Sequence, residues 1–436
     1  MSRTINFITH PAQSIRGDIT VPGDKSISHR SILLSAIASG VTTVTGFLDG
    51  DDCLATIAAC RAMGVRIDGP DEQRVVIYGV GKQGLKKPEE TLDCGNSGTS
   101  IRLLSGLLAA QAFDSTLTGD ASLLKRPMNR VARPLLQMGA MLETNDGCPP
   151  LKVHGGHALH GITYEMPQAS AQVKSCLLIA GMYAKGKTTV IEPEMTRDHT
   201  ERMLATLSYP VRRVGNSITI DSTHEAVSAD IQVPGDLSSA AFFIVAATIT
   251  PGSHLCIRNV GINPTRTGVI DILKQMGADI RIDNQRSYGE EPVADLIIQY
   301  APLKGIEIPE ELVPLAIDEF PIVFIAAACA TGVTTLRGAH ELRCKESDRI
   351  GAMAEGLQRL GIDAIPHEDG ITIHGGVISG GVVESHDDHR IAMAFSIAGA
   401  IATAPITIQH CNNVSTSFPG FVDTAKRAQL QIFSEL

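Results

Sequence analysis

Residues 17–26 read GDITVPGDKS, and residues 229–238 repeat the pattern as ADIQVPGDLS. Both fit D-I-x-V-P-G-D-x-S, and Asp24 recurs as Asp236, an offset of 236 − 24 = 212 residues in a chain of 436. An apolar helical stretch follows each copy, RSILLSAIASG after the first and SAAFFIVAATITPG after the second. Because repetition at a fixed offset indicates repeated structure, the sequence predicts two similar halves.

A smaller unit recurs within each half. A helix rich in small residues ends near a glycine and runs into a β-branched strand, as in SAIASG-VTTVTGF and FIAAACATG-VTTLRGA. A second helix then closes with Met-Gly or Leu-Gly before another strand, as in LKQMGADIRID. The alternation gives about six helix–strand–helix–strand units of roughly 70 residues, three in each half. It predicts an α/β fold.

The two V-P-G-D segments are the expected crossing points between the halves, because proline fixes φ and glycine permits a turn. The predicted N-terminal lobe therefore covers residues 23–236 and holds three repeats. Residues 1–22 and 237–436 together form the predicted C-terminal lobe, with three further repeats. The active site is expected in the cleft between the lobes.

Composition limits the possible functions. The formal net charge is −10, which does not favour capture of nucleic acid, since that requires a basic face. The first residues, MSRTINFITHPAQSIRG, lack the apolar stretch of a signal peptide, and no apolar run reaches the ~18–20 residues that span a bilayer. The nine cysteines show no C-x-x-C pair, as expected of reduced thiols. We therefore expect a cytoplasmic protein that binds neither nucleic acid nor membrane.

Three sequence motifs suggest other functions, but the segments around them do not have the secondary structure or further ligands that those functions require. Residues 181–188 match the P-loop pattern G-x-x-x-x-G-K-[ST], yet a helical segment precedes them and a β-rich one follows, the reverse of a phosphate-binding loop. Residues 79–84 fit G-x-G-x-x-G, but the LKKP that follows cannot open an apolar helix. The histidines of residues 386–389 have no third ligand nearby in sequence, which does not favour a metal site.

Basic residues recur where helices are expected to begin. A helix N-terminus carries partial positive charge, so a cation there is unfavourable by roughly 0.3–1 kcal/mol. Any one such start could be a solvated charge, but about six in successive repeats indicate that an anion is bound. We therefore expect helix ends that converge on an anionic substrate. The basic residues are Lys25, Arg30, Arg102, Lys174, Arg197, Arg202, Lys345, Arg349 and Arg390.

The segments around these starts resemble the 5-enolpyruvylshikimate-3-phosphate synthases over nearly the whole chain. The resemblance implies two globular domains, each of three repeated βαβαββ-type units around buried parallel helices, which close on their substrates. It also implies a monomer. The motifs that carry the resemblance are PGDKSISHR, LDCGNSGTSIR, LLKRPM, PQASAQVKS, TRDHTERM, IDEFP, RCKESDRI, DDHRIAMAF and TSFPGF.

By resemblance, the chain transfers the enolpyruvyl group of phosphoenolpyruvate to the 5-hydroxyl of shikimate 3-phosphate and releases phosphate, without metal or organic cofactor. This is a step of the shikimate pathway, which leads to chorismate and the aromatic amino acids. The expected catalytic residues are Lys25, Asp318 and Glu346. The expected shikimate 3-phosphate ligands are Lys25, Ser26, Arg30, Ser170, Ala171, Gln172, Arg197, Asp318 and Lys345. The expected phosphoenolpyruvate ligands are Lys25, Asn96, Gly98, Arg126, Gln172, Arg349 and Arg390.

Three of these residues also fit plainer structural roles. Asp318 could cap the apolar helix that follows it, Glu346 could be a surface partner of a neighbouring cation, and Arg126 could be a loop charge. In such roles they would contribute to folding and not to catalysis. The sequence alone leaves these alternatives open.

The chain departs from the commoner family pattern at three positions. Ala171 replaces a serine, Thr416 stands where many members have lysine, and Glu341 stands where some have asparagine. These changes resemble a divergent bacterial branch, some of whose members tolerate the herbicide glyphosate and often have alanine at the position of Gly98. Because glycine leaves room for the inhibitor, we predict that glyphosate binds this chain.

Three other functions also fit parts of the sequence. An enolpyruvyl transferase acting on UDP-N-acetylglucosamine has the same chemistry, but such enzymes typically carry a reactive loop cysteine where this chain has Leu-Leu-Lys125-Arg126, and a Lys-Asn opening where it has Lys25-Ser26. A P-loop NTPase would depend on Lys187. A repeat scaffold without catalysis would bind acidic partners through the same helix ends.

Overall fold

The computed structural model describes residues 4–435, which form two compact units. The N-terminal lobe comprises Gly23–Val233 with Tyr288–Glu291, and the C-terminal lobe comprises Met1–Pro22, Pro234–Ser287 and Pro292–Leu436. Residues 1–3 and 436, which the predicted lobe limits include, lie outside the described part. No helix within residues 4–435 is long and apolar enough to cross a membrane.

One plan is repeated through both lobes. A first strand leads into a core helix, a parallel strand, a second helix and a β-hairpin, and the strands form one sheet. In one repeat, β10 (Thr163–Glu165) pairs in parallel with β11 (Lys187–Ile191), which pairs antiparallel with β13 (Ser217–Asp221) of the hairpin. Six sheets are present among the described residues, and some vary this plan, since one has three strands and three include a strand from a distant part of the chain. The predicted alternation of helices and strands is therefore confirmed.

The N-terminal lobe holds three sheets, in the orders β14-β3-β5-β4, β6-β7-β9-β8 and β10-β11-β13-β12. Its core helices are α1 (Lys25–Ala36), α3 (Gly98–Leu108) and α5 (Ala171–Gly181). The remaining elements are α2 (Asp51–Ala62), α4 (Asn129–Gln137), α6 (His199–Thr206), η1 (Leu123–Lys125), β3 (Ser39–Thr45), β4 (Arg66–Asp71), β5 (Arg74–Val80), β6 (Leu92–Asp93), β7 (Ser115–Thr118), β8 (Met141–Asn145), β9 (Cys148–His154), β12 (Arg212–Val214) and β14 (Ile231–Gln232).

The C-terminal lobe holds the sheets β16-β17-β15-β2, β18-β20-β19 and β21-β22-β1-β23. Its core helices are α7 (Leu237–Ile249), α10 (Phe320–Ala328) and α12 (His389–Ala398). The remaining elements are α8 (Gly268–Gln275), α9 (Val313–Ala316), α11 (Arg349–Arg359), α13 (Phe421–Arg427), η2 (Glu310–Leu312), η3 (His340–Cys344), η4 (Asn412–Thr416), β1 (Asn6–His10), β2 (Arg16–Thr20), β15 (His254–Gly261), β16 (Asp279–Tyr288), β17 (Glu291–Gln299), β18 (Val333–Leu336), β19 (Ala364–His367), β20 (Gly370–His374), β21 (Gly381–Glu384), β22 (Ile406–Gln409) and β23 (Gln431–Glu435).

The two V-P-G-D segments join a strand of one lobe to a core helix of the other. Strand β2 pairs in parallel with β15 and is followed by α1, whereas β14 pairs in parallel with β3 and is followed by α7. Asp24 and Asp236 cap the two helices, accepting hydrogen bonds of 2.9 Å from the backbone N–H groups of Ile27 and Ser238. The aspartate of the repeated motif therefore serves to start a helix.

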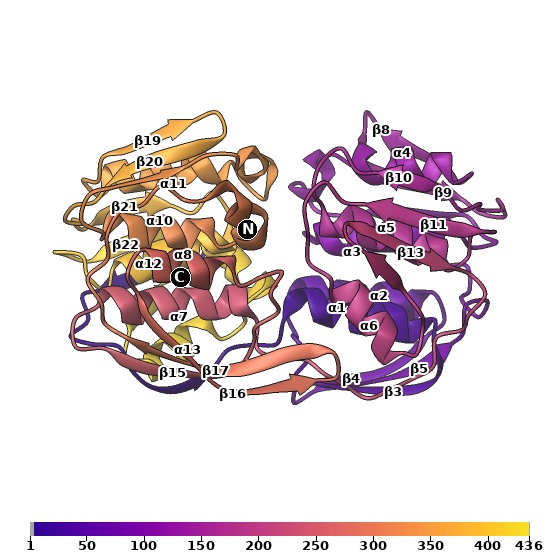
Figure 1. Cartoon of the computed structure of the whole chain (residues 1–436), viewed down its shortest axis with the longest axis horizontal. Helices are drawn as coiled ribbons and strands as arrows, with labels where there is room; N and C mark the ends of the chain where they lie inside the picture. Colours follow the sequence, from indigo (N-terminus) through magenta and orange to yellow (C-terminus); the bar gives the residue numbers. More distant parts are fainter. Residues whose placement is uncertain (1–3, 436) are drawn as a thin grey trace. The chain divides into compact units, whose positions relative to one another are not determined.

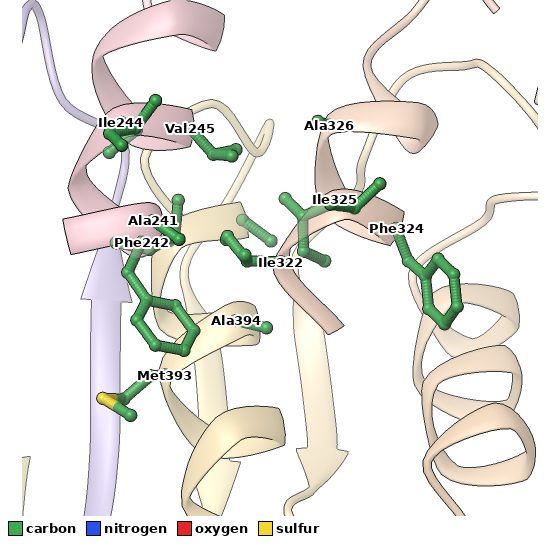
Figure 2. Close-up of a cluster of buried hydrophobic side chains, with 14 of the residues drawn as sticks. Ala241, Phe242, Ile244, Val245, Ile322, Phe324, Ile325, Ala326, Met393 and Ala394 are labelled. Atoms are coloured by element: carbon green, nitrogen blue, oxygen red, sulfur yellow. The ribbon is translucent and has the colours of Figure 1, made fainter. Parts of the chain in front are cut away.

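Helices α7 and α10 are predominantly apolar around their whole circumference, which is typical of helices buried in a protein interior. All residues of α7 and of α10 are buried. Figure 2 shows side chains of α7, α10 and α12 packed together, with Phe242, Ile322 and Met393 among them. Figure 1 shows that each lobe surrounds its core helices with sheets.

Two core helices of the N-terminal lobe approach closely at a glycine. A Cβ on Gly106 of α3 would lie 2.2 Å from the carbonyl oxygen of Cys176 on α5. Because real contacts of this kind do not occur, the packing of α3 against α5 requires glycine at this position. This packing fixes the spacing between the starts of the two helices.

The segments that match the P-loop, G-x-G-x-x-G and histidine motifs have the structures that their sequence context predicts. Gly181 ends α5 and Lys187 begins β11, so the order is helix and then strand. Residues 81–91 after β5 contain no helix. His386 lies 3.5 Å from Glu355 in an ion pair.

Candidate active site

The start of α1 brings together a lysine and a buried carboxylate. Lys25 is the first residue of α1, and its amine forms an ion pair with Asp52, the second residue of α2. The Lys25 side chain is 19% exposed and that of Asp52 only 5%. Asp52 therefore offsets the unfavourable placement of a cation at this helix start.

Arg30 lies one turn further along α1 and is buried. It donates hydrogen bonds to the backbone carbonyl of Ser26 at 2.9 Å and to the hydroxyls of Thr200 and Ser175 at 2.7 Å each. Burial lowers the pKa of Arg30 to about 10, and the positive charge of Arg197 acts in the same direction, whereas Glu201 and Asp24 oppose the shift.

The start of α3 gathers three of the predicted phosphoenolpyruvate ligands. Arg126 donates to the side-chain oxygen of Asn96 at 2.6 Å, and Asn96 donates to Asp120 at 2.7 Å. A Cβ on Gly98 would lie 3.2 Å from an Nη of Arg126 and 2.7 Å from an Nη of Arg102. Arg126 itself is buried.

The start of α5 lies beside that of α3. Ser170 caps α5 by accepting a hydrogen bond from the N–H of Val173 at 3.3 Å. Gln172 accepts from Arg102 at 2.6 Å and donates to the hydroxyl of Thr99 at 3.0 Å. Ala171 is the first residue of α5 and has no hydroxyl to offer. Arg102 therefore connects Gln172 to the segment that carries Gly98.

A dense group of charges forms in the C-terminal lobe around Asp318. The Asp318 carboxylate lies 3.3 Å from the amine of Lys345 and 3.5 Å from a guanidinium nitrogen of Arg349. Its backbone carbonyl accepts a 2.9 Å hydrogen bond from Arg390. Helix α10 has Glu319 at its N-cap position and no side-chain cap. The alternative that Asp318 merely caps this helix is therefore wrong.

Arg349 connects this group to two further carboxylates. It lies 2.6 Å from Glu346 and 2.8 Å from Asp388, which caps α12 by accepting from the N–H of Arg390 at 2.9 Å. Arg349 is 1% exposed. Burial works against its charge, but Asp388 and Glu346 outweigh burial and raise its pKa, so it stays cationic. The pairing of Glu346 with Arg349 agrees with its plainer role and also places a carboxylate beside Asp318.

Lys345 is held between two carboxylates. Its amine lies 3.2 Å from Glu341 in addition to its contact with Asp318. Burial lowers the pKa of Lys345, but Asp318 and Glu341 outweigh burial and raise it. Glu341, at which the family pattern varies, is therefore part of this group. Thr416 ends η4 and donates its hydroxyl to the carbonyl of Asn413.

Most of the predicted helix starts are capped by the chain itself. Side chains of Asp24, Ser97, Ser170, Asp348 and Asp388 accept hydrogen bonds from the first turns of α1, α3, α5, α11 and α12. Carboxylates of the same lobe pair with several of the nearby cations, among them Lys25, Lys345 and Arg349, whereas Arg102 is held by the amide of Gln172. Sequence reasoning missed these carboxylates, although each stands within a few residues of a basic helix start or opens a helix itself.

Comparison with known proteins agrees with this geometry. A family model described as EPSP synthase (3-phosphoshikimate 1-carboxyvinyltransferase) matches residues 9–425. The chain belongs to the EPSP synthase family. It is 65% identical over 428 residues to the 3-phosphoshikimate 1-carboxyvinyltransferase of Legionella pneumophila strain Philadelphia 1, covering 98% of this chain and 99% of the relative. The corresponding protein of Methylococcus capsulatus is 62% identical, with 99% of each chain covered.

A solved structure of an EPSP synthase from Acinetobacter baumannii superposes on the chain with a TM-score of 0.90. The two sequences are 56% identical, and the match covers 100% of both chains. The predicted enolpyruvyl transferase fold is therefore confirmed. The chain is a transferase of this family, and no comparison favours the UDP-sugar or NTPase alternatives.

Proposed function

We propose that the chain transfers the enolpyruvyl group of phosphoenolpyruvate to the 5-hydroxyl of shikimate 3-phosphate and releases phosphate. The observation that carries the proposal is the charged group of the C-terminal lobe, where Asp318 lies 3.3 Å from Lys345 and 3.5 Å from Arg349. A carboxylate that can accept a proton stands there beside cations that can hold anions. Membership of the EPSP synthase family supports the choice of substrates.

The reaction needs an acid and a base at different atoms. A proton added to the methylene carbon of phosphoenolpyruvate makes the neighbouring carbon electrophilic, and the 5-hydroxyl oxygen then bonds to that carbon as its own proton is removed. The tetrahedral intermediate breaks its carbon–oxygen bond to phosphate and loses a methyl proton, which restores the double bond. We assign removal of the hydroxyl proton to Asp318 and proton transfer at the methylene carbon to Glu346, with Lys25.

The remaining residues hold the two anions. We assign shikimate 3-phosphate to Lys25, Ser26, Arg30, Ser170, Ala171, Gln172, Arg197, Asp318 and Lys345. We assign phosphoenolpyruvate to Lys25, Asn96, Gly98, Arg126, Gln172, Arg349 and Arg390. The buried, hydrogen-bonded guanidinium of Arg349 supports its assignment, because a fixed cation stabilises the charge that develops on the departing phosphate. The buried guanidinium of Arg30 is likewise fixed by hydrogen bonds, as a ligand of the 3-phosphate group should be.

The assay follows release of inorganic phosphate from phosphoenolpyruvate. We expect release to depend on shikimate 3-phosphate and to be absent with UDP-N-acetylglucosamine as the acceptor. Phosphate release with the UDP-sugar alone would overturn the proposal. If no phosphate were released with either acceptor, the repeat scaffold without catalysis would be favoured.

We further propose that the enzyme acts in the cytoplasm as a monomer. Both substrates are phosphorylated small molecules, which do not cross membranes unaided. Light scattering after gel filtration should give the mass of a single chain. A dimer mass at the concentrations used for the assay would contradict the proposed monomer.

A further inference from the structure

The N-terminal lobe contains a cluster of four charged side chains, two of them fully buried, that the proposed reaction does not use. Lys174 of α5 lies 3.1 Å from Glu192 and 2.8 Å from Glu201 of α6. Arg213 of β12 lies 3.1 Å from Glu192 and 3.5 Å from Glu201. The side chains of Lys174 and Glu192 are both 0% exposed. The charges of the two cations and the two carboxylates cancel. We call these four residues the Lys174 cluster.

The cluster holds the segment that leads to Arg197. The Lys174 amine donates a 3.4 Å hydrogen bond to the backbone carbonyl of Thr196, the residue before Arg197. Both the N–H and the hydroxyl of Thr196 donate to the same oxygen of Glu192, the N–H at 3.3 Å. The backbone on which Arg197 stands is therefore fixed from two sides.

The cluster also connects to Arg30. Ser175, the residue after Lys174, shares a 2.7 Å hydrogen bond with Thr200, the residue before Glu201. Arg30 donates to both of these hydroxyls. The ion pair between Lys174 and Glu201 thus ties together the two helices that place the partners of Arg30.

Stability alone does not account for such a cluster. Removing charges from water costs several kcal/mol per ion, and a buried ion pair is often replaced by apolar residues without loss of stability. A binding site, in contrast, needs its ligand-binding side chains held within about 0.5 Å of their working positions, and this depends on the residues that pack against and hydrogen-bond to those side chains. The predicted phosphoenolpyruvate ligands Asn96 and Arg126 are bonded to each other and lie on other segments. Gln172, an expected ligand of both substrates, stands on α5 but is held by Arg102 and Thr99 of α3 and not by the Lys174 cluster.

We propose that Lys174 and Glu192 are positioning residues, which set Arg197 and Arg30 for the phosphate of shikimate 3-phosphate. This inference rests on the proposed function. It assigns the Lys174 cluster to one substrate and not to the other. Loss of the cluster should therefore change the Michaelis constant for shikimate 3-phosphate selectively.

The test is steady-state kinetics of Lys174→Met, varying each substrate with the other saturating. Displacing a binding group by about 1 Å costs up to about 100-fold, so we expect KM for shikimate 3-phosphate to rise about tenfold. KM for phosphoenolpyruvate should stay within about twofold of wild type. The milder Glu192→Gln, which keeps an acceptor for Thr196, should raise the same constant by about threefold and provides the test if Lys174→Met does not fold.

Lys82 supplies a matched control. It is a second buried lysine of this lobe, 7% exposed, whose amine donates to the carbonyls of Ser222 and His224 at 2.9 and 2.8 Å. Lys82→Met should lower the melting temperature without a selective change in either KM. Folded Lys174→Met or Glu192→Gln with both constants near wild type, or with both raised equally, would overturn the inference. A wild-type chain without turnover would instead refute the proposed function.

Discussion

The substitution Gly98→Ala gives a sharp test of the predicted phosphoenolpyruvate site. Gly98 is the first residue of α3 and is buried. Its backbone does not need the left-handed region, since it is absent from the glycines with positive φ. Alanine also favours a helix over glycine by up to about 1 kcal/mol. We therefore expect the variant to fold with a melting temperature at or above that of wild type.

The added methyl group would contact the guanidinium groups of two arginines. The new Cβ would lie 2.7 Å from Arg102 Nη1, whereas ordinary van der Waals contact begins at 3.4 Å, so this guanidinium must retreat by about 0.7 Å. Arg126 Nη1, at 3.2 Å, must give by about 0.2 Å. Because Arg102 donates to Gln172 at 2.6 Å, its shift also disturbs Gln172. A displacement of this size should raise KM for phosphoenolpyruvate on the order of tenfold.

The assay measures both Michaelis constants and inhibition by glyphosate. We expect KM for shikimate 3-phosphate to change much less than that for phosphoenolpyruvate, and inhibition by glyphosate to weaken. In a double-mutant cycle, Arg102→Ala removes the obstructing guanidinium, so Gly98→Ala should cost less in that background. Unchanged phosphoenolpyruvate kinetics and unchanged inhibition in the single variant would refute the steric reasoning.

Three further predictions follow from the same contacts. Asp318→Asn and Glu346→Gln should bind both substrates in a calorimetric titration yet lose at least about 100-fold in kcat; near-normal turnover in either would remove its catalytic role. Burial lowers the pKa of His29 in the folded chain well below its ordinary 6.5. As the pH falls below about 6.5, His29 is therefore protonated in the unfolded chain before it is protonated in the folded one. The free energy of unfolding then falls by up to about 1.4 kcal/mol per pH unit. His29→Gln should flatten that slope in denaturant titrations at pH 5 to 7, and the exposed His157→Gln should leave it unchanged. Gly106→Ala should destabilise the chain by about 1–3 kcal/mol, because its methyl group meets a carbonyl of α5, and an unaltered denaturation midpoint would contradict the described packing.

The fold was largely predictable because short, local sequence patterns indicate its repeated helices and strands. Each repeat places an apolar helix before a glycine and a β-branched strand, and these propensities agree with the tertiary structure. The pairing of strands was not predictable in the same way. Strand β1 at the start of the chain lies between β22 and β23 near its end, and no local pattern reports a partner about 400 residues away.

The candidate site was predictable in its cations and less so in their partners. Basic residues at helix starts contradict the helix dipole, so Lys25, Arg349 and Arg390 could be singled out from sequence. Asp52 and Asp388 could not, because a carboxylate at a helix start is the ordinary case and attracts no notice. The Lys174 cluster was not predictable either, because Lys174 could be singled out from sequence but its partners Glu192, Glu201 and Arg213 join it only through tertiary packing.

The central proposal is that basic residues at helix starts hold the acidic substrates. Its most direct test is a calorimetric titration of shikimate 3-phosphate into wild type, Arg197→Leu and Lys345→Met, one variant from each lobe. The exposed ion-pair residue Arg66 provides the control Arg66→Leu. We predict that each of the first two variants weakens binding at least about tenfold and that the control matches wild type. Wild-type affinity in both Arg197→Leu and Lys345→Met would contradict the claim.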